Sequence, residues 1–251
     1  MIKIFRKIRQ NLLTENLPTG QAGKTSKYLL YATGEIILVV IGILIALSIN
    51  NWNQKQVAKK QIRNIYAKII QDFNHTATEI ERDVARMDII QPLMRDVLLG
   101  KVNRDSLLTN DAYFRKYFSS TTGYPDIKIN ETGIRLLESK IELNYELNTE
   151  LTEALTLLYS EHLFEFEIDA IELSNNFSTL LNYITGKGIK VDYVIDKNPG
   201  TFITMIFEDD TFRNYFFEYV KSYRVYKNRL KRFKTKGAIL VDRIKTEYNL
   251  D

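Results

Sequence analysis

The chain contains no cysteine, 2 histidines and 4 prolines among its 251 residues. The lack of cysteine excludes disulfides, thiolate metal sites and cysteine nucleophiles, and two histidines leave little for imidazole chemistry. With 4 prolines and 11 glycines, long tracts lack the residues that punctuate β-rich folds, so long helices are expected. No Gly-x-Ser-x-Gly elbow or secretion-type zinc motif is present. We expect no enzyme, no catalytic residue, no cofactor and no metal site.

The strongest candidate catalytic constellation joins Asp72 with His75 and His162 with Glu165. Each pair has i, i+3 spacing, so two helical faces could enclose a metal in a bundle core. Neither pair has the Glu-x-x-His order of di-iron sites. One surface histidine and one core histidine is the preferred interpretation.

One long apolar run decides the class of protein. Residues 36–49 carry no charge, and the 22 residues 28–49 carry one, Glu35. At about 1.5 Å per residue they form about 33 Å of helix, enough for a bilayer core of about 30 Å. We predict a transmembrane helix over residues 28–50.

Aromatic residues stand at both ends of this helix, as is typical of membrane interfaces. These interfacial anchors are Tyr28, Tyr31 and Trp52. A buried core helix and a cleaved signal peptide are the alternatives. The apolar stretch exceeds a usual signal-peptide core of about 7–15 residues, and 27 residues precede it, which favours a retained anchor.

The segment 1–27 is basic and places Ile4, Ile8 and Leu12 along one side, as an amphipathic helix on the inner leaflet would. Residues 18–25 resemble a phosphate-binding loop, but Pro18 replaces its first glycine and no strand precedes it, so a linker is preferred. Basic counts on the two sides of the membrane helix are nearly balanced. A short basic tail is hard to translocate, which favours an inner-membrane protein with a cytoplasmic N-terminus and a periplasmic C-terminal domain.

One face of the membrane helix carries Glu35, Val39, Gly42 and Ala46. Gly42 and Ala46 form a small-xxx-small pair that lets another helix approach closely. This face predicts a homo-oligomer or a membrane-protein partner. Two interpretations of Glu35 stay open, because a carboxylate here either faces a partner or water path, or snorkels to the headgroups.

Residues 1–53 carry the pattern FRKIRQNLL, then GEIILVVIGILIAL, then NWN, and Asn130–Leu137 and Leu151–Tyr159 form a looser second block. The chain thereby resembles a family of uncharacterised Bacteroidota single-pass membrane proteins with a domain of unknown function. Residues 17–26 are an apparent insertion relative to that family. The resemblance implies an inner-membrane anchor and a helical domain, and it supplies no catalytic residues.

Three tracts beyond or overlapping the membrane helix lack both Gly and Pro: 43–91, 134–185 and 201–236. Apolar residues recur every three or four positions in each tract, which predicts an all-α antiparallel bundle of about four helices over 51–251. The predicted stripe of the first tract is Ile62, Ile65, Ile69, Phe73, Ile80, Val84 and Met87, and the predicted seam of the third is Phe212, Phe216, Tyr219, Tyr223, Tyr226, Leu230 and Phe233. Its first helix is expected to continue from the membrane helix and to end near Pro92. Residues 187–204, of which 190–195 alternate in polarity, are expected to hold a short strand or hairpin.

The net charge of +4 hides two opposed blocks. Residues 138–172 hold ten acidic groups and one base, and residues 219–241 hold eight bases and no acid. Neighbouring helices would favour this pairing. Otherwise the bases are a candidate surface for lipid headgroups or an acidic protein. This candidate basic surface comprises Lys221, Arg224, Lys227, Arg229, Lys231 and Arg232.

The sequence therefore predicts a membrane-anchored, non-catalytic interaction or assembly module, oligomeric through the Glu35 face, with the lipid bilayer as a partner. Two alternatives stay open: an ion-coupled or motor-associated subunit that uses Glu35, and a periplasmic ligand sensor with a pocket beside the Tyr219–Tyr226 seam. Neither a nucleic acid nor a small-molecule ligand is expected.

Overall fold

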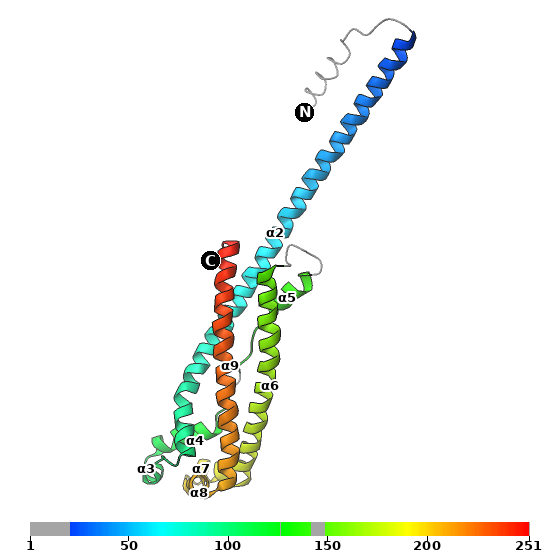
Figure 1. The fold of residues 1–251 in the computed structure, drawn as a ribbon. Coiled ribbons are helices and arrows are strands. Elements are labelled where there is room, and N and C mark those ends of the chain that lie inside the picture. Colours follow the sequence, from blue (N-terminus) through cyan, green and yellow to red (C-terminus); the bar gives the residue numbers. More distant parts are fainter. Residues whose placement is uncertain (1–20, 126, 142–148, 251) are drawn as a thin grey trace. The chain divides into compact units, whose positions relative to one another are not determined.

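The computed structural model describes residues 21–125, 127–141 and 149–250, and every regular element in these ranges is a helix (Figure 1). The expected all-α fold class is confirmed. The chain divides into two compact units, Met1–Lys59 and Lys60–Asp251. Helix α2 (Gln21–Leu98) includes the boundary between them.

The first unit contains the apolar run. Its most apolar 18-residue window has a mean hydropathy of 2.5, and none of that window is buried. Among the described residues, the helical stretch Tyr31–Leu98 is the one long and apolar enough to cross a membrane, judged by length and composition.

The second unit is built on three long helices: α2 from Lys60 onward, α6 (Glu150–Gly186) and α9 (Asp210–Tyr248). Helix α9 runs antiparallel to α2, because the Tyr66 ring packs on that of Tyr248 near the end of α9 and Asp88 pairs with Lys227 nearer its start. It also runs antiparallel to α6, because Arg243 contacts Glu150 and Asn176 contacts Glu218. The described residues 99–125 and 127–141 return along the bundle, and α2 and α6 run parallel (Figure 1).

Short helices fill the connections. They are α3 (Arg104–Thr109), α4 (Asp111–Thr122), α5 (Thr132–Ile141), α7 (Ile189–Val194) and α8 (Gly200–Glu208). Side-chain caps set several boundaries: Asn110 accepts from the Tyr113 N–H to begin α4, and Asp209 accepts from the Phe212 N–H to begin α9.

The apolar stripes predicted from spacing form the core between the three long helices. On α9 the entire predicted seam is buried: Phe212, Phe216, Tyr219, Tyr223, Tyr226, Leu230 and Phe233. On α2 the predicted stripe is buried as well: Ile62, Ile65, Ile69, Phe73, Ile80, Val84 and Met87. Burial of one stripe on each helix is the main source of bundle stability.

Two boundary predictions were wrong. Helix α2 continues past Pro92 to Leu98, because Leu93, Met94 and Val97 are buried beyond the proline and outweigh the hydrogen bond it removes.

The second error concerns residues 187–204, which hold helix α7 and the start of α8 and no strand. Ile189 and Tyr193 are four residues apart and therefore lie on one face of α7. Ile189 is buried, and the Tyr193 ring lies 4.3 Å from that of Phe114, so packing selects the helix.

Candidate functional site

The membrane-helix face lies in the first unit. Glu35, Val39, Gly42 and Ala46 are all exposed, and a Cβ added at Gly42 would meet no atom within 4 Å. Small residues four apart allow close helix approach in a bilayer. Within the described part of this unit nothing covers the face, so it is open to another helix.

The predicted interfacial anchors are exposed as well. Tyr28 and Trp52 are the most exposed of the three, and Tyr31 is less so. Tyr28 and Trp52 are separated by about 36 Å of helix, close to a bilayer core plus part of its headgroup regions. Amphipathic rings at this spacing suit the two membrane interfaces.

The acidic and basic blocks lie on neighbouring helices, because α6 and α9 pack side by side. Arg229 Nε donates to Asp169 Oδ2 at 2.7 Å, and its Nη1 donates to Glu165. Nearer the other end of the pair, Arg243 Nη1 lies 3.4 Å from Glu150 Oε1. The opposed charges therefore join these two helices.

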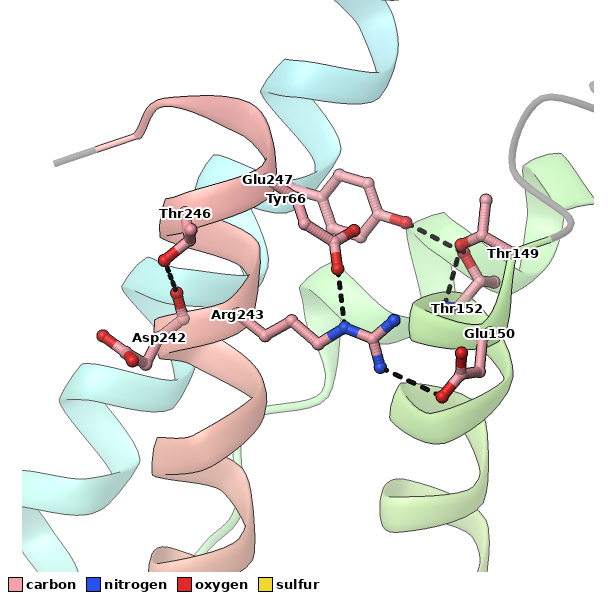
Figure 2. A network of polar contacts seen from close by, with 8 residues as sticks. All are labelled: Tyr66, Thr149, Glu150, Thr152, Asp242, Arg243, Thr246 and Glu247. Atoms are coloured by element: carbon pink, nitrogen blue, oxygen red, sulfur yellow. Dashed lines mark hydrogen bonds and ion pairs between the residues drawn. The ribbon is translucent and has the colours of Figure 1, made fainter.

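Figure 2 shows the Arg243 contact together with the polar layer beside it. Arg243 also donates to Glu247 Oε1 at 2.6 Å on its own helix. The Tyr66 hydroxyl lies 2.8 Å from Thr152 Oγ1, and Thr149 Oγ1 accepts from the Thr152 N–H as the cap of α6. All three long helices thus meet in one hydrogen-bonded layer.

Part of the basic block faces α2. Lys227 is buried, with its Nζ 2.9 Å from Asp88 Oδ1 and hydrogen-bonded to Gln91 Oε1. Lys231 lies 3.3 Å from the same carboxylate. The hydrogen bond from Lys227 is the largest cause that lowers the pKa of Asp88. These bases hold α9 against α2.

The rest of the candidate basic surface divides between paired and unpaired groups. Lys221 pairs with Glu218 on its own helix at 3.1 Å, and Arg229 pairs with α6. Arg224 and Arg232 are exposed and make no ion pair with the described residues. The six bases therefore do not form one free patch.

The buried carboxylate of Asp72 holds the start of α5 against α2, a structural role that the sequence did not predict. Asp72 is 2% exposed, and its Oδ2 accepts from the Gly133 N–H at 2.7 Å while Oδ1 accepts from Asn130 Nδ2 at 3.1 Å. Thr76 Oγ1 accepts from the Asn130 N–H, and Lys68 Nζ lies 2.8 Å from Asp72. Asp72 thus accepts, from another helix, one of the backbone N–H groups in the first turn of α5 that have no partner within their own helix.

Sequence reasoning placed Asp72 beside His75 as one half of a candidate metal site. The structure instead leaves His75 exposed and turns Asp72 toward Gly133. The available signal was the turn-forming stretch Asn130–Gly133, whose glycine allows the backbone to approach Ile69. A Cβ at Gly133 would lie 2.8 Å from the Ile69 nitrogen.

His162, from the other candidate pair, is a core residue. It is 3% exposed, its ring packs edge-on to Phe233, and neither ring nitrogen has a hydrogen-bond partner. Burial lowers its pKa, which favours the neutral ring. Among the described residues, no three His, Asp or Glu side chains gather as a metal site.

The aromatic seam of α9 is packed against its neighbours. Tyr219, Tyr223 and Tyr226 are buried, and the Tyr219 ring lies 5.5 Å from that of Phe177. Burial raises the pKa of Tyr219 and Tyr223. Two cavities, of about 300 and about 490 Å³, lie elsewhere, at residues 141–160 and 183–211. Beside Tyr219 the packed ring of Phe177 occupies the space next to this seam.

No family model, curated protein or solved structure matches the chain. Two features of the molecule therefore carry the functional inference. They are the exposed apolar run of α2 and the charged helix faces of the bundle.

Proposed function

We propose that this protein is a single-pass inner-membrane protein whose helical bundle is a non-catalytic interaction and assembly module. The exposed run Ile36–Ile49 carries the proposal, because all of its large apolar side chains lie on the surface. Exposure to water costs about 25 cal/mol per Å² of apolar surface, whereas bilayer hydrocarbon solvates the same side chains. A bilayer is the environment that matches this surface.

The proposed orientation places the N-terminus in the cytoplasm and residues 51–251 in the periplasm. Short basic segments resist translocation, while long domains cross largely regardless of charge. The resemblance of residues 1–53 to the Bacteroidota membrane family supports the same anchor.

Fractionation and protease protection test the anchor and its orientation. Full-length protein with a C-terminal epitope, made in a Gram-negative host, should stay in the membrane pellet after alkaline carbonate extraction. Protease should digest the epitope-bearing domain once the outer membrane is permeabilised. Release by carbonate would overturn the anchor, and protection until the inner membrane is lysed would reverse the orientation.

The proposed oligomer forms through the face of Glu35, Val39, Gly42 and Ala46. Its support is the close approach that Gly42 permits, since no atom occupies the space beside it. Gly42→Leu should reduce chemical cross-linking between copies in native membranes. Gly34→Leu, in the same helix but off this face, is the matched control and should leave cross-linking unchanged. Equal effects of both substitutions would contradict the assigned face.

The rival function is an ion-coupled subunit, which the exposed carboxylate of Glu35 favours. Proton flux into liposomes that contain the purified protein separates the two functions. An assembly module should give no flux above empty liposomes. Flux that Glu35→Gln abolishes, with cross-linking retained, would establish the rival.

A further inference from the structure

Helix α6 carries a second apolar stripe, on the side opposite the core. Leu157, Phe164, Ile168 and Ile171 are 54%, 68%, 49% and 60% exposed. They recur at spacings of seven, four and three residues, the pattern of a helix-packing seam, over about 21 Å of helix. A helix in a monomeric bundle normally exposes polar residues here, so this stripe suits an additional helix.

The charges beside the stripe decide against a second α6 as the occupant. The acidic groups Glu161, Glu165, Glu167 and Glu172 flank it, and among the described residues Glu165 alone of the four has a cationic partner on another helix. In a parallel α6 pair, Glu167 of one copy would lie opposite Glu172 of the other, in flanking positions where opposite charges stabilise and like charges repel. The complementary occupant is a helix with apolar residues among bases.

The outer face of α9 has these properties. Val225 and Ile239 are exposed apolar residues, and Arg224, Arg232 and Lys236 are exposed bases that make no ion pair within the described ranges. All five lie away from the buried seam of α9. This face is therefore basic and partly apolar, as the stripe on α6 requires.

The register inside the bundle gives the levels at which the two faces would meet. Asn176 Nδ2 donates to the Glu218 carbonyl at 3.4 Å, and Arg229 binds Asp169. Between these contacts, Ile171 lies level with Val225.

The same register extends along the helices. It places Glu172 level with Arg224 and Leu157 level with Ile239, beside the contact of Arg243 with Glu150. Ile171 and Leu157 of α6 are thus each level with an exposed apolar residue of α9, and Glu172 is level with an unpaired base.

Copies related by a rotation about an axis parallel to the bundle helices keep these levels from one copy to the next. Apolar side chains would then face apolar ones, Glu172 would face Arg224, and Phe164 would face the guanidinium of Arg232.

We propose that the outer face of α6 binds the outer face of α9 of a second copy, in a head-to-tail contact that repeats from copy to copy. The common orientation of the copies rests on the proposed membrane anchor. The partner of the proposed assembly module is then a second copy of the same protein.

Disulfide trapping tests the contact, and the lack of native cysteine means that no background thiol must be removed. Full-length copies carrying Leu157→Cys and Ile239→Cys, with different epitopes, are co-expressed and oxidised in native membranes. A disulfide needs Cα atoms within about 7 Å, so this level pair should give a mixed dimer. The off-level pair of Leu157→Cys with Val225→Cys should give none.

A charge exchange provides the second measurement. In the Leu157→Cys and Ile239→Cys pair, Glu172→Arg or Arg224→Glu alone should lower the mixed-dimer yield about tenfold. Both together should restore it. Neither side chain is in the core, so unchanged near-UV circular dichroism is expected for each variant.

Three results would overturn the contact: a dimer from Leu157→Cys alone, equal yields for level and off-level pairs, or a disulfide to a different protein. Carbonate extraction of the same membranes separates this failure from failure of the anchor. If the protein stays in the pellet but the Leu157→Cys and Ile239→Cys copies form no disulfide, the interface is refuted and the membrane anchor is retained. Protein released by carbonate refutes the anchor.

Discussion

The bundle should depend strongly on Asp72, which joins α2 to the start of α5. Asp72→Ala removes the acceptor of two hydrogen bonds, from the Gly133 N–H and from Asn130 Nδ2. Hydrogen bonds to a charged group contribute about 1.5–3 kcal/mol each, and the buried donors are left without partners. We expect a loss of about 3–5 kcal/mol in the free energy of unfolding.

Two matched substitutions divide this loss into its parts. Asp72→Asn keeps an oxygen for the Gly133 N–H and removes the charge, so a loss of about 1–2 kcal/mol is expected. Lys68 is 37% exposed and pairs with Asp72 across one helical turn, so Lys68→Ala should cost about 0.5 kcal/mol or less.

Urea unfolding of the full chain in detergent, followed by near-UV circular dichroism of its tyrosines, measures these losses. With a slope of about 2–3 kcal/mol per molar urea, Asp72→Ala should lower the midpoint by about 1–2 M. Hydrogen exchange should accelerate first in the peptide that contains Gly133. If Lys68→Ala matches Asp72→Ala, or if exchange near Gly133 stays unchanged, the capping role of Asp72 is refuted.

Three further predictions concern the core between the long helices. His162 has a lowered pKa in the fold, so unfolding takes up a proton, and stability should be complete above about pH 6.5 and fall as the pH drops below it. The pH slope of thermal unfolding should vanish in His162→Phe and persist in His75→Phe. Gly237→Ala places a Cβ inside the ring of Phe73, and a loss of about 1–3 kcal/mol in urea unfolding is expected; an unchanged midpoint would contradict this close approach. Arg229→Met leaves the carboxylate of Asp169 without its cation and should cost about 2–3 kcal/mol, which a second substitution, Asp169→Leu, should largely restore.

Helical periodicity predicted the core because each long helix buries a single stripe. The α9 seam from Phe212 to Phe233 is buried at every predicted position, and the charge blocks correctly predicted that α6 and α9 are neighbours. Local rules failed where tertiary contacts decide. Burial of Met94 carries α2 past Pro92, and the Tyr193 ring, packed on Phe114, selects a helix for a segment with strand-like alternation.

The role of Asp72 was beyond local reasoning for a different reason. Its partners Asn130 and Gly133 are about sixty residues away, and no spacing rule relates them to α2. The exposed stripe on α6 was missed because a periodic analysis finds the stronger of two stripes and assigns it to the core. Burial alone separates the two, since Leu155 is buried and Leu157 is exposed.

The distribution of charge on α9 explains why a second copy is the fitting partner. One side of this helix faces α2, where Lys227, Lys231 and Lys234 bind Asp88 and Glu81. Another side faces α6 through Arg229. Among the long helices α9 has only these two neighbours, so within the described ranges the bases on its third side meet no acidic long helix of their own chain. On the outer side of α6, Glu161, Glu167 and Glu172 make no ion pair with another helix in the described ranges, whereas Glu165 binds Arg229. Glu172 of α6 and Arg224 of α9 lie at matching levels on different sides of one bundle, and a contact between successive copies brings these two unpaired charges together.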